Sequence, residues 1–264
     1  WNTIRIPGVL QRIAIVYFLS SISFLFLGRQ LVISLYVFFL LLHWFLLTQI
    51  PVPEIGKASL EIGKNLSGWL DFYLMPNHLW IHTKTWDPEG ILGTLSAISS
   101  CLFGVYYGQI FLVEKKFTTS QFYFGIFFGL LLVSLSFFWD ITFPINKNLW
   151  TGSFVLLNSG LAIIILHLLY EWIDVSKSNF WHKGFEVFGV NALTAFFLSS
   201  LFSKILNIPV IENINGKSVG LKTYLYTQCF TPYFSSNNAS LAWALSYTLT
   251  WLTFFFILFS PSLD

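Results

Sequence analysis

The chain has 264 residues, of which 55% are hydrophobic and 10% are charged, and its formal net charge at pH 7 is +2. Soluble domains carry about 25% charged residues, so this composition excludes an ordinary soluble domain. The small net charge, without a basic run, gives no sign of nucleic-acid binding, and the two cysteines lack the spacing of metal ligands. We therefore expect an integral, multi-pass membrane protein without a metal.

Nearly uncharged stretches follow one another along the chain, each close to the roughly 20 apolar residues that cross a bilayer. They are too long and too evenly apolar for barrel strands, which alternate over about ten residues. The sequence therefore predicts an all-α, polytopic transmembrane helical bundle with about seven spans. We expect them at 9–28, 31–50, 91–112, 121–142, 149–170, 186–206 and 240–259. One domain over 1–264, with polar loops at about 51–89 and 207–239, accounts for the whole length.

Three polar motifs lie outside these stretches: RIPGVLQR at 5–12, WDPEG at 86–90 and PINKNLW at 144–150. The first precedes the first span, the second lies between spans two and three, and the third lies between spans four and five. Each pair of spans returns the chain to the same face of the membrane. The three motifs are therefore expected on one face, which predicts a single polar site at one membrane surface.

The acidic motif allows two interpretations. In the first, Asp87 caps a helix, Pro88 takes the first helical position and Glu89 favours the positive helix end. In the second, the fixed carboxylate of Asp87 orients a base. His78, in the loop just before, is then the candidate general base, because a carboxylate can orient its ring. A single histidine at a membrane surface is otherwise simply hydrogen-bonded.

Arg5, Gln11 and Arg12 in the first motif are candidate substrate-binding or cofactor-binding residues. Arg12 lies deep enough to cost about 1–3 kcal/mol unless it reaches the headgroups or pairs. The alternative is a guanidinium that faces the bundle interior and binds a phosphate or carboxylate through two hydrogen bonds. We expect Arg12 to face other helices and to have a fixed partner, and Arg5 to lie less deep.

Further binding candidates are Glu89, Asn146, Lys147, Trp150 and Asn191. Asn146 can cap the fifth span, while Lys147 and Trp150 are ordinary interface anchors, so each signal is weak by itself. Asn191 lies inside the sixth span, where a buried amide usually bridges helices. The count of lysines and arginines does not decide which face is cytoplasmic. The motif face carries more of them, but mostly in its long loops, where the positive-inside rule is weaker.

Taken together, the motifs resemble the heparan-α-glucosaminide N-acetyltransferase family. RIPGVLQR at 5–12, DPEG at 87–90 with LGT at 92–94, and NKNLWT at 146–151 fit its pattern, as do HLW at 78–80 and GVNAL at 189–193. The order and spacing match over nearly all of the chain. Any one motif is weakly specific, whereas five in order are strongly so.

The resemblance implies a membrane-embedded acyltransferase. Such an enzyme moves an acetyl group from cytosolic acetyl-CoA, its co-substrate, to an amino sugar or related glycan acceptor across the membrane. The resemblance also implies that the motif face is the lumenal or periplasmic one. For this chain we expect a multi-pass protein in the lipid bilayer of a bacterial inner membrane, and a homodimer stays open.

The chain departs from the family in the spans that precede the arginine motif. Family members carry about three more spans there, about ten in all, and the family's catalytic histidine lies in them, so no residue here corresponds to it. The family's basic C-terminal tail is also absent. We therefore interpret the chain as an N-terminally incomplete member that is inactive alone. His78 and Asp87 are its remaining catalytic candidates.

A transporter or permease for a small polar solute is the alternative function. It predicts broken helices and charged residues in the middle of the membrane. In this sequence Arg12, Asp140 and Glu186 lie near span ends, and the span centres hold amides and hydroxyls. That pattern favours a site at the surface over an ion relay.

Overall fold

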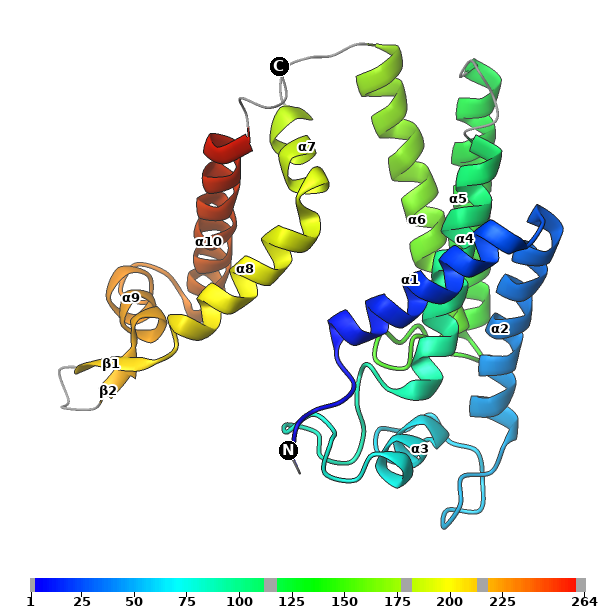
Figure 1. The fold of residues 1–264 in the computed structure, drawn as a ribbon, viewed down its shortest axis with the longest axis horizontal. Helices are drawn as coiled ribbons and strands as arrows, with labels where there is room; N and C mark the ends of the chain where they lie inside the picture. The colour runs from blue at the N-terminus through cyan, green and yellow to red at the C-terminus, as the bar shows by residue number, and fades with distance from the viewer. Residues whose placement is uncertain (1–2, 112–117, 177–181, 213–217, 260–264) are drawn as a thin grey trace. The chain divides into compact units, whose positions relative to one another are not determined.

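The computed structural model describes residues 3–111, 118–176, 182–212 and 218–259, and these are mainly helical (Figure 1). The chain separates into two compact units, Trp1–Ser176 and Lys177–Asp264. Each unit is described by itself. The single domain expected over the whole chain stays a prediction.

Six helices in the described part of the chain are long and apolar enough to cross a membrane. The all-α, multi-pass fold predicted from the sequence is thereby confirmed. Most predicted spans agree with these helices to within four residues at each end. The helices are α1 (Val9–Phe26), α2 (Arg29–Gln49), α4 (Ile91–Phe111), α5 (Thr119–Asp140), α6 (Gly152–Tyr170), which continues through the π-helical turn η1 (Glu171–Val175), and α10 (Ser236–Phe259).

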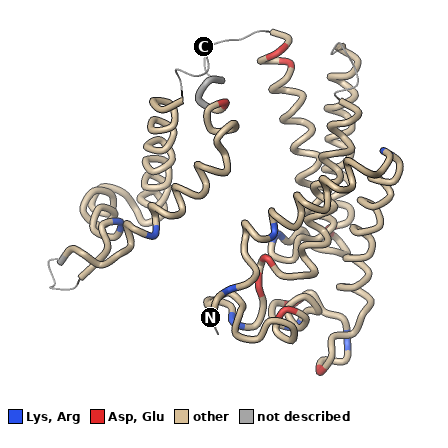
Figure 2. Tube along the Cα trace, in the orientation of Figure 1, with Lys and Arg blue, Asp and Glu red and all other residues tan. Residues whose placement is uncertain are grey.

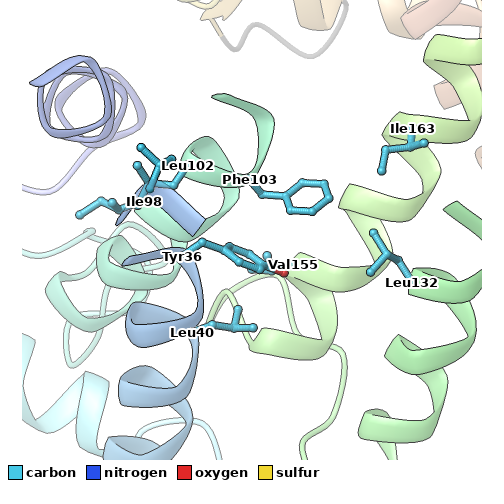
Figure 3. Packing of buried hydrophobic residues seen from close by; sticks show 9 residues of the cluster. Tyr36, Leu40, Ile98, Leu102, Phe103, Leu132, Val155 and Ile163 are labelled. Atoms are coloured by element: carbon cyan, nitrogen blue, oxygen red, sulfur yellow. The ribbon is translucent and has the colours of Figure 1, made fainter. Parts of the chain in front are cut away.

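The first unit is held together by apolar packing among α2, α4, α5 and α6 (Figure 3). Tyr36 and Leu40 of α2 meet Leu102 and Phe103 of α4, and Val155 of α6 closes the cluster. The Tyr36 and Phe103 rings lie 5.3 Å apart between centroids. Without water between helices, such close packing is the main force that holds a bundle together in lipid. Figure 2 shows the middles of these helices free of charged residues.

Close backbone contact between α5 and α6 depends on two glycines. A Cβ atom at Gly160 would lie 2.6 Å from the Gly129 carbonyl oxygen and 2.8 Å from a methyl carbon of Val133. A Cβ at Gly129 would lie 2.8 Å from the Gly160 carbonyl oxygen. The two helices can therefore approach this closely only because both positions lack a side chain.

Gly160→Ala is expected to reduce the yield of folded protein in detergent, because the helices must separate to admit the methyl group, at a cost of about 1–3 kcal/mol. Size-exclusion chromatography of the solubilised protein measures this. Gly104→Ala is the matched control, since a Cβ there meets nothing within 4 Å. Equal monodisperse yields for the two variants would contradict the close contact.

The first polar loop, predicted at about 51–89, contains the short helix α3 (Leu66–Leu74). The Asn65 side chain caps it by accepting the Gly68 N–H at 2.8 Å. Among its residues, Leu66 and Asp71 are buried, and α3 packs against α2 and α4. The loop is thus an ordered segment that packs on one end of the first unit, next to the start of α4.

The second unit differs from the sequence-based expectation at the sixth span. The stretch predicted as one helix over 186–206 is divided into α7 (His182–Val190) and α8 (Ala192–Ile205). Asn191 leaves helical geometry, with φ −108° and ψ 21°, and its side-chain amide donates to the Val187 carbonyl at 3.0 Å. This side chain competes with the backbone for the same acceptor. Neither piece alone reaches the length of a span.

The rest of the second unit includes the predicted loop over 207–239, which also has regular structure. Strand β1 (Pro209–Glu212) pairs antiparallel with β2 (Ser218–Gly220), and α9 (Leu221–Cys229) follows β2. The small hydrophobic core of the second unit consists of Val187, Ala195 and Phe255. The Tyr247 hydroxyl of α10 donates to the Ser199 carbonyl of α8 at 2.7 Å.

Candidate functional site

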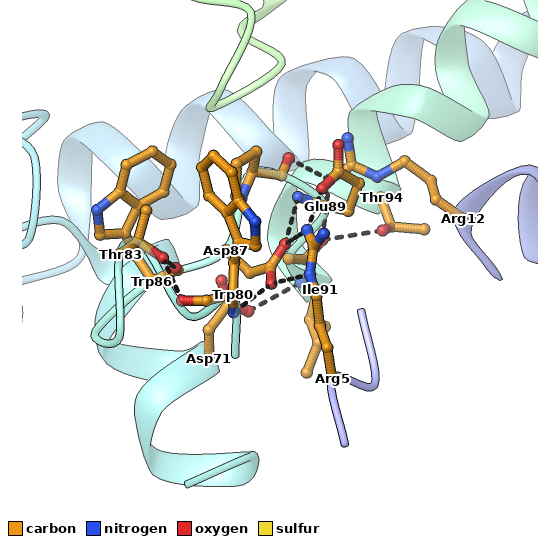
Figure 4. A network of polar contacts seen from close by, with 12 residues as sticks. Arg5, Arg12, Asp71, Trp80, Thr83, Trp86, Asp87, Glu89, Ile91 and Thr94 are labelled. Atoms are coloured by element: carbon orange, nitrogen blue, oxygen red, sulfur yellow. Dashed lines mark hydrogen bonds and ion pairs between the residues drawn. The ribbon is translucent and has the colours of Figure 1, made fainter. Parts of the chain in front are cut away.

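Asp87 is the centre of the polar cluster at the start of α4 (Figure 4). Its side chain is fully buried. Arg5 donates to it from Nε at 2.8 Å and from Nη2 at 2.6 Å. The backbone N–H groups of Trp80 and Glu89 donate at 3.0 and 2.9 Å. Four donors therefore converge on this carboxylate, which needs its full negative charge to accept them all.

The expectation that Asp87 caps the helix is wrong in its details. Helix α4 begins at Ile91, four residues further on, and the Ile91 N–H is accepted by Asp71 of α3 at 2.9 Å. Asp87 instead closes the turn before the helix, through its bond to the Glu89 N–H. The residue that caps α4 is therefore Asp71, which lies 20 positions before Ile91 in the sequence.

Arg5 lies between the two carboxylates of the acidic motif. Besides Asp87, it donates to Glu89, and its guanidinium lies 5.6 Å from the centre of the Trp80 ring. The hydrogen bond to Asp87 raises the pKa of Arg5 above its ordinary value against the opposing effect of partial burial, and Glu89 adds to the rise. About a third of the Arg5 side chain is exposed, so this ion pair borders solvent or headgroups.

Arg12 joins the three motifs. It is 7% exposed, and its Nη2 donates to the carbonyls of Pro88 at 2.9 Å and Gly90 at 3.2 Å. Its guanidinium lies 5.2 Å from the centre of the Trp150 ring. The predicted interior orientation and fixed partner are confirmed, although the partner is backbone carbonyl and aromatic ring rather than a carboxylate. The convergence of the three motifs at one end of the helices is also confirmed.

Trp150 is held in an unusual conformation. Its φ is +55°, which is rare for a bulky residue and costs on the order of 1–3 kcal/mol. Its indole N–H donates to the Ser100 hydroxyl at 3.0 Å, and its ring faces Arg12. The surrounding contacts hold the ring against the guanidinium, which marks this residue as more than an interface anchor.

The other candidates from the third motif have different surroundings. The Asn146 side chain accepts the backbone N–H of Asn148 at 2.8 Å, and the backbone N–H of Asn146 donates to the Thr151 hydroxyl at 3.0 Å. It therefore shapes the turn before α6. Lys147 is exposed. Asn191 belongs to the second unit, and its part in a site stays a prediction.

His78 lies beside the N-terminal segment. Its Nδ1 is 2.7 Å from the Ile4 carbonyl, so Nδ1 carries the proton and donates. The Ile6 N–H donates to the His78 carbonyl at 2.9 Å. The contact that the structure shows for this ring is thus with Ile4, not with the carboxylate of Asp87. The tautomer leaves Nε2 with a lone pair, as a general base requires.

A groove of about 650 Å³ runs between α1 and α4 beside this cluster. Its lining is mainly apolar, and polar groups are contributed by Gln11, Arg12, Glu89 and Thr94. Gln11 is thereby placed next to the cluster, as its motif suggested. In the described part of the chain, no group of three or more His, Cys, Asp or Glu side chains is arranged to hold a metal ion.

Asp71 is the residue that the sequence did not point to. It is fully buried, and it contacts the first residue of α4. It stands in a polar loop among nine other charged or histidine side chains, and its own position matches no recognisable motif. The one available signal was Gly90, directly after the acidic motif, because a glycine there indicates that something approaches the backbone closely.

Comparison with known proteins gives two curated relatives. The heparan-alpha-glucosaminide N-acetyltransferase of Homo sapiens is 30% identical over 228 residues, covering 66% of this chain and 34% of the relative. The Mus musculus protein of the same name is 28% identical over 227 residues, with the same coverage. The chain thus spans about a third of the length of these relatives. No protein-family model matches it. The resemblance seen in the motifs is confirmed.

Proposed function

Because this chain belongs to the heparan-alpha-glucosaminide N-acetyltransferase family, we propose that it forms part of a membrane-embedded acetyltransferase. The acetyl group comes from cytosolic acetyl-CoA and passes to an amino sugar or related glycan acceptor on the other side of the membrane. The observation that carries this proposal is the meeting of Arg5, Asp87, Arg12 and Trp150 at one end of the helices. Motifs this far apart in sequence converge when they build one site.

Acetyl transfer sets three chemical requirements. The acceptor nitrogen attacks the thioester carbonyl, a C–N bond forms, the C–S bond breaks, and the amine loses a proton as the thiolate leaves. A base must take that proton, donors must stabilise the developing oxyanion, and water must be kept out. His78 Nε2 is our candidate for the base. The apolar lining of the groove beside Gln11 and Arg12 can keep water away from the reacting groups.

The arginines have a defined part in this proposal. Both are already paired, Arg5 with carboxylates and Arg12 with backbone carbonyls, so neither is a vacant anchor for the coenzyme's phosphates. Their role is to hold the Pro88–Gly90 turn and to place positive charge beside the groove. The groove's volume and apolar lining suit a flexible chain such as the pantetheine arm or the apolar part of an acceptor.

Turnover of acetyl-CoA by the purified full-length protein tests the proposal. Reconstituted in liposomes with labelled acetyl-CoA on one side and glucosamine on the other, it should form N-acetylated sugar on the acceptor side. The alternative transporter gains one observation, because the break at Asn191 is a feature of discontinuous transporter helices. Uptake of solute without consumption of acetyl-CoA would favour that alternative and contradict the enzyme.

We further propose that the motif face lies away from the cytoplasm, on the periplasmic side of a bacterial inner membrane. Cysteines introduced at Ser59 and Lys147, both on the motif face, should react with an impermeant thiol reagent in intact cells. A cysteine at Arg29, at the opposite end of α2, should react only after permeabilisation. Lys115, which the predicted spans also place on the opposite face, lies outside the described residues. The reverse labelling pattern would overturn this orientation.

A further inference from the structure

Asp71 holds the start of α4 from outside the helix. Its Oδ1 accepts the Ile91 N–H at 2.9 Å, one of the N–H groups that a helix start leaves without an intrahelical partner. Its Oδ2 is buried and has no hydrogen-bond partner in the structure. One oxygen of this carboxyl group is therefore hydrogen-bonded, while the other is buried without a hydrogen bond. A buried acceptor without a donor costs free energy of folding.

Gly90 fits against this carboxyl group. A Cβ atom added at Gly90 would overlap the Asp71 carboxyl carbon and both of its oxygens, so only glycine allows the approach. The Gly90 carbonyl, on the other side of the same peptide, accepts from Arg12 at 3.2 Å. The turn Pro88–Gly90 therefore lies between Asp71 on one side and Arg12 on the other, and contacts both. On its outer side, Asp87 and Glu89 hold Arg5.

We infer that Asp71 is a positioning residue of the site. Its carboxyl group fixes the Pro88–Gly90 turn and the start of α4, and through that turn it fixes where Arg12 and Arg5 lie. The expected effect of Asp71 on turnover rests on the proposed function. Its effect on the geometry of the turn does not, because that follows from the contacts of Asp71 with Gly90 and Ile91. Removal of the Asp71 carboxyl should release the turn even though the carboxyl touches neither arginine.

The protonation of Asp71 gives an independent readout. Burial raises the pKa of this carboxyl to about 6, against the backbone N–H groups of Ile91 and Asp87, which lower it. The charges that act on it are Asp87 in the turn and Arg12 on α1. Glu89 lies in the same turn, and α2, which also packs on α3, carries His43 near this end. The folded protein therefore holds this proton more tightly than the unfolded chain does.

Stability should accordingly fall as the pH rises from about 4 to about 6, with the full cost present above that window. Asp71→Asn keeps an oxygen for the Ile91 N–H and removes the charge. It should raise the thermal midpoint in detergent by about 5 °C at pH 7.5 and leave it almost unchanged near pH 4. The same pH dependence in Asp71→Asn and in the parent protein would overturn the assignment of the buried charge to Asp71.

The positioning itself is tested by thiol labelling of a cysteine at Thr94, in a background without Cys101 and Cys229. The Thr94 hydroxyl donates to the Gly90 carbonyl and lines the groove, so its reactivity reports on the turn. Asp71→Ala should speed labelling at least ~fivefold and lower kcat at least ~tenfold, or ~1.4 kcal/mol of barrier. Asp71→Asn should stay within ~threefold of the parent in both, and Glu61→Gln, an exposed carboxylate of the same loop, should change neither.

The outcomes separate the two proposals. Unchanged labelling and kcat in folded Asp71→Ala would show a role in stability alone and overturn the positioning role. If Asp71→Ala does not fold, the thermal midpoints of Asp71→Asn against pH decide. If the parent protein transfers no acetyl group, the proposed function fails, while labelling and thermal midpoints still decide what Asp71 does.

Discussion

Asp87→Asn is expected to lower acetyl transfer by the full-length protein at least ~tenfold, equivalent to ~1.4 kcal/mol of barrier. All four groups that meet this carboxylate are donors, two from Arg5 and one each from Trp80 and Glu89. An asparagine of the same shape must point its NH₂ at two of these donors, because each Asp87 oxygen accepts from two, and it loses the charge that holds Arg5. The initial rate of N-acetylated product formation measures the loss.

The choice of asparagine separates the two interpretations of Asp87. The Oδ1 of asparagine can accept the Glu89 N–H and close the turn as aspartate does, so a role in the turn alone would leave the rate nearly unchanged. Asp140→Asn is a suitable control, because Asp140 also accepts a backbone N–H, from Ile145 at 2.6 Å, but lies outside the cluster. A normal rate in well-folded Asp87→Asn would return Asp87 to a purely structural role.

Arg12→Ala is expected to cause a larger loss of folded protein than Arg5→Ala. Removal of the buried guanidinium leaves the Pro88 carbonyl without its donor, removes one of the donors to the Gly90 carbonyl, and leaves the Trp150 ring without its cation. These contacts together stabilise the fold by roughly 2–4 kcal/mol. Arg5 is about a third exposed, so solvent or headgroups can partly replace it, and Asp87 keeps the N–H donors of Trp80 and Glu89.

The yield of monodisperse protein after solubilisation, compared at equal expression, measures the difference. Arg12→Lys should fall between the parent and Arg12→Ala, because an ammonium can bond carbonyls but is not planar and cannot stack on the Trp150 ring as the guanidinium does. Equal yields for Arg5→Ala and Arg12→Ala would contradict the interior role of Arg12 and favour a side chain that merely reaches the headgroups.

The spans were predictable because each is a long apolar run whose length the bilayer dictates. The convergence of the motifs was predictable from parity, which needs only the number of spans between them. The break at Asn191 was not, because one amide that bonds back to the Val187 carbonyl leaves the apolar pattern of the stretch intact. Hydropathy therefore predicts one span over 186–206, whereas the backbone forms the two helices α7 and α8.

The details of the site depend on contacts between distant residues, and no local pattern encodes those. The sequence indicated that Arg12 has a partner but could not show that the partner is a pair of backbone carbonyls. Asp71 was missed because its role arises when α3 folds back on the start of α4. The positive φ of Trp150 was invisible for the same reason, since Asn146 and Thr151 shape that turn through bonds across it.

A double-mutant cycle on acetyl transfer tests most directly whether the motifs act as one site. Arg5→Gln, Asp87→Asn and the double variant are compared with the parent protein under identical conditions. Residues that work as a unit are strongly non-additive, so the double variant should be within about twofold of the slower single variant. A double variant whose loss equals the product of the two single losses would show independent residues and contradict a single shared site.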